Sequence, residues 1–184
     1  MPLNWVFMAG FFANFTILLF YLLIFWVLIR SSRKRRMELF FSGFVAGAFS
    51  IIIVYVIYNI PHIKEIASHI VEEMSKFIIV FLFLNWKKSR DRLLRDKDSV
   101  LWYGLIVGLF FAFLENSFYI DLGLEVMLKR GFISWPMHMI YTACSTYGLV
   151  QILVYRKNNE WLLLLPASIF LHFLFNQFIA PIIP

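Results

Sequence analysis

Six predominantly apolar runs of 16 to 25 residues account for most of this 184-residue chain. A helix needs about 20 such residues to cross a bilayer, and within lipid every backbone polar group must be hydrogen-bonded inside the segment. We therefore predict an all-α fold: a polytopic membrane helix bundle of about six transmembrane helices, forming one integral membrane domain over residues 1–184. The predicted spans cover residues 5–29, 39–60, 71–86, 99–120, 132–155 and 161–181.

The composition excludes a soluble protein. Hydrophobic residues make up 61% of the chain and charged residues 15%, whereas a soluble domain averages about 45–50% and about 25%. The net charge of +6 does not indicate a nucleic-acid partner, because the basic residues stand in short runs beside the apolar ones, where they act as topology signals. The single cysteine, Cys144, lies inside a predicted span, so no disulfide can form within the chain.

Three features refine the predicted helices. The third run has only 16 residues, so we expect its helix to begin earlier, within residues 62–70. The connection 121–131 is predicted to be a loop. The second run contains Gly43 and Gly47, and the fourth contains Gly104 and Gly108; glycines at this spacing allow another helix to approach closely.

The distribution of Lys and Arg predicts the orientation in the membrane. The connections after the first, third and fifth runs hold 13 of the 17 basic residues, and those after the second and fourth runs hold 3. Short loops rich in Lys and Arg remain in the cytoplasm. We therefore predict a multi-pass protein of the plasma membrane with both termini extracytoplasmic.

Ionisable residues from four spans are predicted to converge on one level in the outer half of the bilayer. An ionisable group inside a span costs about 2.5–3.5 kcal/mol, so it usually faces a partner or a wet cavity. At 1.5 Å per residue, Glu115 lies about 8 Å, His138 about 9 Å and His172 about 14 Å from the outer end of its span. The third run adds Glu72, Glu73 and Lys76 near its outer end.

Two imidazoles and up to three carboxylates at one depth are typical of a hydrolytic site. In one chemistry, Glu115, His138 and His172 bind Zn²⁺ and leave a position for water, with Glu72 or Glu73 as general base. In the other, no metal is present: a carboxylate of the glutamate pair activates water, and the histidines stabilise the developing oxyanion. The sequence leaves both chemistries open, with Glu73 preferred over Glu72 as the base because it lies deeper in the span.

Two further polar residues belong to the predicted catalytic set. Lys76 shares a helix face with both acids, and Asn176 lies one turn after His172, where it can orient the imidazole. Other interpretations are open. The acids and Lys76 can form an interfacial charge cluster with the lysine extending outward, and each histidine can pack between helices. Arg130 is interpreted as a counter-charge for lipid headgroups or loop acids.

Four short motifs follow one another within the core 71–178. They are Glu72-Glu73-x-x-Lys76, Phe111-x-x-x-Glu115-Asn116-x-x-Tyr119, His138 in the fifth run, and His172-x-x-x-Asn176. Their order, spacing and shared depth resemble the PrsW family of intramembrane proteases, which belongs to a superfamily with the CAAX-processing endoproteases and the scaffold subunit of gamma-secretase. The resemblance implies cleavage of a single-pass membrane protein or peptide near the extracytoplasmic side by Glu- and His-assisted water activation.

Two other functions fit parts of this pattern. A non-catalytic membrane scaffold of the same superfamily is the alternative, but a scaffold needs no water-activating base, so the acids and histidines favour an enzyme. An ion or proton carrier is weakened because the cytoplasmic halves of the spans lack the polar residues that would complete a path. We therefore expect an intramembrane endopeptidase that depends on glutamate or on a metal.

Overall fold

The computed structural model describes residues 5–30, 32–60, 63–87 and 97–182, and within these ranges the regular structure is entirely helical. The predicted all-α bundle is confirmed. Helix α3 begins at Ile63, as the shortness of the third apolar run predicted. The six long helices are α1 (Trp5–Leu28), α2 (Arg33–Tyr58), α3 (Ile63–Lys87), α4 (Lys97–Asn116), α6 (Trp135–Leu153) and α7 (Leu164–Leu174).

Among the described residues, four helical stretches are long and apolar enough to cross a membrane: α1, α2, α4 with the 3₁₀ turn that follows it, and the stretch around α7. Helices α3 and α6 are more polar because they carry residues that point into the bundle. Glu73 and Lys76 of α3 are fully buried, and so is Thr142 of α6. The two helices therefore bury their polar faces between other helices rather than exposing them to lipid.

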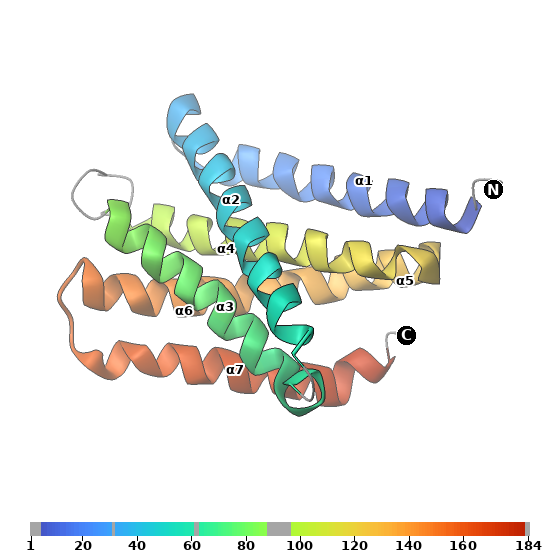
Figure 1. Cartoon of the computed structure of the whole chain (residues 1–184). Coiled ribbons are helices and arrows are strands. Elements are labelled where there is room, and N and C mark those ends of the chain that lie inside the picture. The colour runs from blue at the N-terminus through green and yellow to red at the C-terminus, as the bar shows by residue number, and fades with distance from the viewer. Residues whose placement is uncertain (1–4, 31, 61–62, 88–96, 183–184) are drawn as a thin grey trace.

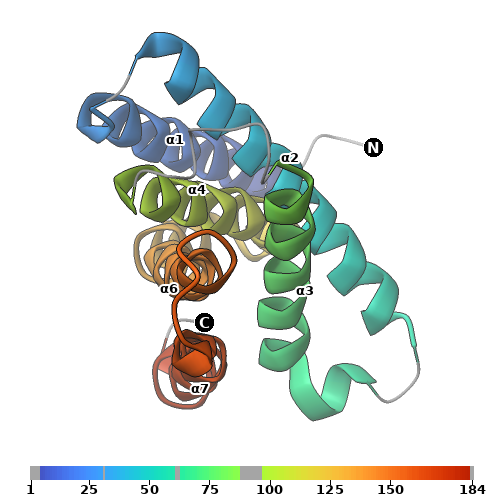
Figure 2. The ribbon, with the colours of Figure 1, turned by 90° about the vertical axis from the view of Figure 1, so that its left-hand side faces the viewer.

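The helices form two layers. Helices α1, α4, α6 and α7 lie side by side in one layer, and α2 and α3 cross over them on one face (Figure 1). The end-on view shows the same stack, with α2 against α4 and α3 against α6 and α7 (Figure 2). Helix α1 begins and the segment after α7 ends at the same end of the bundle (Figure 1).

Glycines let α4 pack closely against helices on two sides. A Cβ atom at Gly104 would lie 2.6 Å from the Cα atom of Ala143, and one at Gly108 would lie 2.6 Å from the carbonyl oxygen of His138, both on α6. A Cβ atom at Gly47 of α2 would lie 2.9 Å from the backbone nitrogen of Phe111 on α4. Only a residue without a side chain fits at these crossings, so the glycine pairs fix how α2, α4 and α6 meet.

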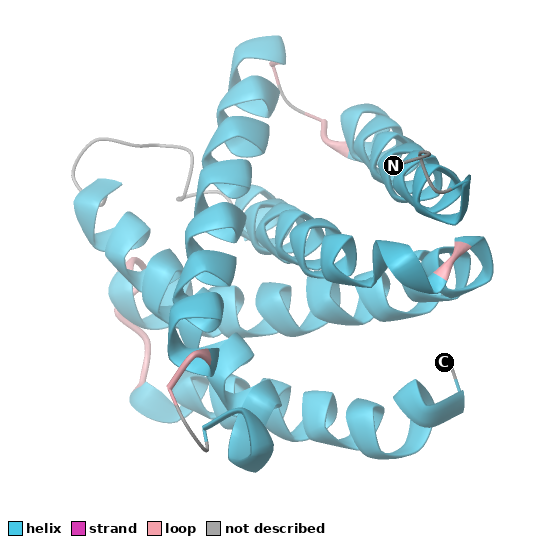
Figure 3. Ribbon diagram, turned by 45° about the vertical axis from the view of Figure 1, so that its right-hand side comes forward, coloured by secondary structure: helices cyan, strands magenta, loops and turns pink. Residues whose placement is uncertain are grey.

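The connection that the sequence predicted as a loop is largely helical. A 3₁₀ turn (Ser117–Leu122) and a short helix α5 (Leu124–Lys129) meet at Gly123, whose φ of 94° turns the chain. Helix α5 is held by the ion pair between Glu125 and Lys129, at 2.8 Å, and by the buried Met127. The short loop segment between the 3₁₀ turn and α5 is drawn in pink in Figure 3.

A π-helical turn (Arg130–Ser134) joins α5 to α6 just before Pro136. Proline has no N–H to donate to the carbonyl four residues earlier, and its ring crowds that carbonyl. A widened turn relieves this conflict, and such π-turns are frequent at functional sites. Arg130 is the first residue of this turn, so it stands between α5 and α6, beside the predicted site residues.

Candidate active site

Helix α3 contributes three polar residues to the centre of the bundle. Glu73 accepts a bond from Lys76 Nζ at 2.5 Å, and both side chains are fully buried. Glu72 lies one residue earlier, and its Oε1 atom accepts a hydrogen bond of 2.8 Å from the hydroxyl group of Tyr58, the last residue of α2. The end of α2 therefore fixes one oxygen of Glu72, and the next turn of α3 fixes Glu73.

His138 of α6 contacts a carboxylate with one ring nitrogen and faces an ammonium group with the other. Its Nε2 atom lies 2.9 Å from Oε2 of Glu115, and its Nδ1 atom lies 3.5 Å from Nζ of Lys76. The side chain is almost fully buried, and its ring packs near that of Phe111. A histidine with one nitrogen against a carboxylate has a fixed ring orientation.

His172 of α7 is held in the same manner. Its Nδ1 atom lies 2.9 Å from Oε1 of Glu73, and its ring stacks on that of Tyr141. The other nitrogen, Nε2, lies 3.6 Å from Oε2 of Glu72. Counting residues along the spans placed His172 about 5 Å deeper than His138. In the structure the two rings are neighbours, with their centroids 5.0 Å apart.

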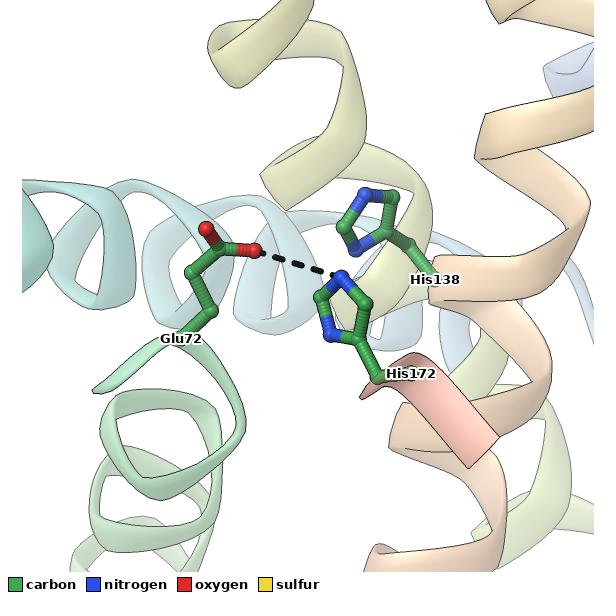
Figure 4. Close-up of side chains that lie close together, drawn as sticks. All are labelled: Glu72, His138 and His172. Atoms are coloured by element: carbon green, nitrogen blue, oxygen red, sulfur yellow. Dashed lines mark ion pairs between the residues drawn. The ribbon is translucent and has the colours of Figure 1, made fainter. Parts of the chain in front are cut away.

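Glu72, His138 and His172 form one group of possible metal ligands. One donor atom from each lies within 4.8 Å of the others, and all three residues are buried. Figure 4 shows the carboxylate and the two rings turned toward one another from α3, α6 and α7. The sequence placed Glu115 in the ligand set. In the structure Glu115 contacts Nε2 of His138, and the group of possible ligands contains Glu72 rather than Glu115.

Arg130 is the partner of Glu115, and sequence reasoning did not assign it to the site. Its Nη2 atom donates to Oε1 of Glu115 at 2.8 Å, and its Nε atom donates to Oδ1 of Asn116 at 2.8 Å. The guanidinium group lies 3.8 Å above the ring of Tyr119. Asn116 in turn donates to Oδ1 of Asn14 on α1, at 2.8 Å. The sequence did not indicate the pairing of Arg130 with Glu115, because Arg130 was predicted to lie in a loop.

A cavity of about 370 Å³ opens onto these residues. Glu72, Glu115, His138 and His172 line it, and Asn176 forms part of its wall. Glu73 and Tyr141 hold the His172 ring, the role that the sequence suggested for Asn176. Asn176 is thus placed to contact whatever enters the cavity.

The residues present fit a divalent metal ion. One carboxylate and two imidazoles is a common ligand set for catalytic zinc. Each imidazole also contacts an outer carboxylate, Glu115 for His138 and Glu73 for His172, which is the usual second layer around metal-bound histidine. Lys76 works against a cation, because its Nζ atom lies 3.5 Å from Nδ1 of His138; its pairing with Glu73 reduces this effect.

The ion pair between Arg130 and Glu115 allows a test by stability. Replacing Arg130 with Met leaves a buried carboxylate without its partner, so we expect the free energy of unfolding in detergent to fall by about 3 kcal/mol. Adding Glu115→Gln to the Arg130→Met variant should restore part of the lost stability. The matched control is Lys129→Met, which breaks the exposed pair with Glu125 and should cost less than about 1 kcal/mol. Additive losses in the double variant would contradict the pairing.

One of three comparisons with known proteins assigns the chain to a family. A search of curated proteins found no match, and neither did a search of solved structures. The family model of the PrsW family intramembrane metalloproteases matches residues 3–183, which is nearly the whole chain. A match of that extent, over a helical membrane bundle with buried glutamates and histidines, shows that the chain belongs to the PrsW family of intramembrane metalloproteases.

Proposed function

We propose that this intramembrane protease hydrolyses a peptide bond of single-pass, membrane-anchored protein substrates near the extracytoplasmic side, with Glu72, His138 and His172 at the reacting centre. The observation that carries the proposal is a shared pattern of orientation. Each of the three groups has one polar atom held by an outer partner, and these partners are Tyr58, Glu115 and Glu73 in that order. The second oxygen of Glu72 and Nε2 of His172 face each other at 3.6 Å beside the cavity and can meet water or substrate, whereas Nδ1 of His138 lies 3.5 Å from Nζ of Lys76.

In the chemistry without a metal, Glu72 is the better candidate for the carboxylate that acts on water. Its Oε2 atom faces His172, and the residue lines the cavity. Glu73 is fully buried, and its Oε1 atom is bonded to both Lys76 and His172. The sequence favoured Glu73 for its depth. The contacts favour Glu73 as the residue that orients His172, and Glu72 as the residue that meets the nucleophile.

The site has more acidic than basic side chains, which favours binding of a cation. Glu72, Glu73 and Glu115 carry three negative charges, and Lys76 and Arg130 carry two positive ones. We propose that Glu72, His138 and His172 hold a Zn²⁺ ion. Bound zinc supplies a water molecule of lowered pKa and polarises a carbonyl group. The protein residues orient the donors, exclude bulk water and neutralise the outer carboxylates.

A substitution series tests the carboxylate roles. We expect Glu72→Gln to lower cleavage by about 10²–10⁴-fold, because the site loses a zinc ligand or, in the chemistry without a metal, the group that acts on water. Glu73→Gln should also lower cleavage sharply, because His172 loses its orienting charge. The measurement is cleavage of a library of single-pass membrane-anchored reporters in proteoliposomes, with Glu125→Gln as the exposed control. Normal turnover by both buried variants would remove the glutamate pair from the mechanism.

Metal analysis separates the two chemistries. We expect stoichiometric zinc in the purified protein, retained in His69→Ala and lost in His172→Ala. Cleavage should disappear on chelation and return on adding Zn²⁺. Full cleavage by a protein shown to hold no metal would overturn the zinc proposal and leave Glu72 as a direct base, with the histidines donating to the substrate carbonyl.

We further propose that both termini lie outside the plasma membrane, as the distribution of basic residues predicts. Reporter fusions after Arg36 and Asp98 should report the cytoplasm, and fusions after Lys64 and Lys129 should report the exterior. The reverse pattern would place the cavity in the inner half of the bilayer and contradict extracytoplasmic cleavage. This measurement needs no substrate, so it tests orientation independently of activity.

A further inference from the structure

A second cavity adjoins the active-site cavity. It measures about 340 Å³ and lies between α2 and the segment from α4 through the following 3₁₀ turn. Tyr58, Glu72, Glu115 and Tyr119 line both cavities, so the two share a polar wall. Anything that reaches the carboxylate of Glu72 from this side passes through the second cavity.

Apart from Asn59, the rest of the second cavity is apolar, and its outer side lies at the surface of the bundle. Ile51 and Val54 of α2 form its inner side and are buried. Tyr55 and Phe118 form its outer side, where they are 61% and 63% exposed. Their rings stack at 6.5 Å between centroids, so they bridge α2 to the 3₁₀ turn after α4. An apolar entrance thus leads from the bilayer to a polar wall.

We propose that this second cavity is a specificity subsite, which takes one large apolar side chain of the substrate beside the scissile bond, with Tyr55 and Phe118 as its entrance. The inference rests on the proposed function and names what that function selects. A volume of about 340 Å³ lies at the lower end of the range for ligand pockets, roughly 300–1,000 Å³. It suits one or two side chains, not a whole transmembrane helix.

The polar wall indicates a peptide and not a lipid chain as the occupant. A substrate helix must unwind locally to present a peptide bond, and its freed N–H and C=O groups then need partners, because lipid offers none. Tyr58, Tyr119 and the two carboxylates supply such partners at the inner end. An acyl chain has no polar group that could bond to them. Lipid tails are as apolar as leucine, so selection here comes from fit to the cavity.

Filling the cavity tests the proposal. In proteoliposomes, cleavage is compared for single-pass reporters that carry Phe or Ala at each position flanking the cut. The unmodified protein should prefer Phe at one position by about 10–100-fold in kcat/KM. Val54→Phe should occupy the cavity and reduce that ratio at least tenfold. The control is Val56→Phe, the same change on the same helix at a residue 60% exposed to lipid, and it should leave the ratio unchanged.

A second variant keeps the proposal testable if Val54→Phe does not fold. Tyr55→Ala removes half of the entrance at an exposed position, and we expect it to lower the Phe preference without any core substitution. An active protein whose ratio stays the same in both variants overturns the subsite, and so does a lipid that co-purifies in this cavity and is retained during turnover. An unmodified protein that cleaves no reporter overturns the proposed function itself, so the two failures are distinguishable.

Discussion

Cancellation of charge inside an apolar bundle is the constraint on which the rest of the structure depends. Lys76 and Arg130 are each bonded to a carboxylate, Glu73 and Glu115, at 2.5 and 2.8 Å. A buried charge without a partner is strongly destabilising, whereas a paired and hydrogen-bonded one is tolerated. Each carboxylate also contacts an imidazole. The pairs that make the fold possible therefore also fix the two histidines.

Close helix packing brings these pairs together. Gly104 and Gly108 allow the backbone of α4 to lie against the backbone of α6, and Gly108 lies directly against the carbonyl of His138. A larger residue at Gly108 would push α6 away and carry the His138 ring from Glu115. Small residues at helix crossings are the usual means of association in lipid, where burial against a neighbour gains little hydrophobic free energy. Site geometry and helix packing are thus set at the same crossing.

Much of the fold was predictable from sequence, because apolar length, charge bias and depth are one-dimensional properties. The six helices, the early start of α3 and the convergence of Glu115, His138 and His172 all followed from them. The candidate ligand group was harder to predict, because whether Glu72 or Glu115 faces both histidines depends on how each helix is rotated about its axis. Tyr58 and Asn14 were missed because a single polar residue in a span looks the same whether it packs or orients a catalytic group. Arg130 was missed because a helix and a π-turn replace the predicted loop.

Hydrolysis within a bilayer needs water where water is scarce, and the site meets this need through the same groups that carry charge. A cavity of about 370 Å³ lined by Glu72, Glu115, His138 and His172 has room for several water molecules, each of which needs two to four polar partners. Water held there solvates the carboxylate edges that face the cavity and so lowers the cost of burying them. In the proposed reaction the same water is the nucleophile. Removing the charged groups to gain stability would therefore remove the water, which gives a physical reason for a membrane protein to keep five charges at its centre.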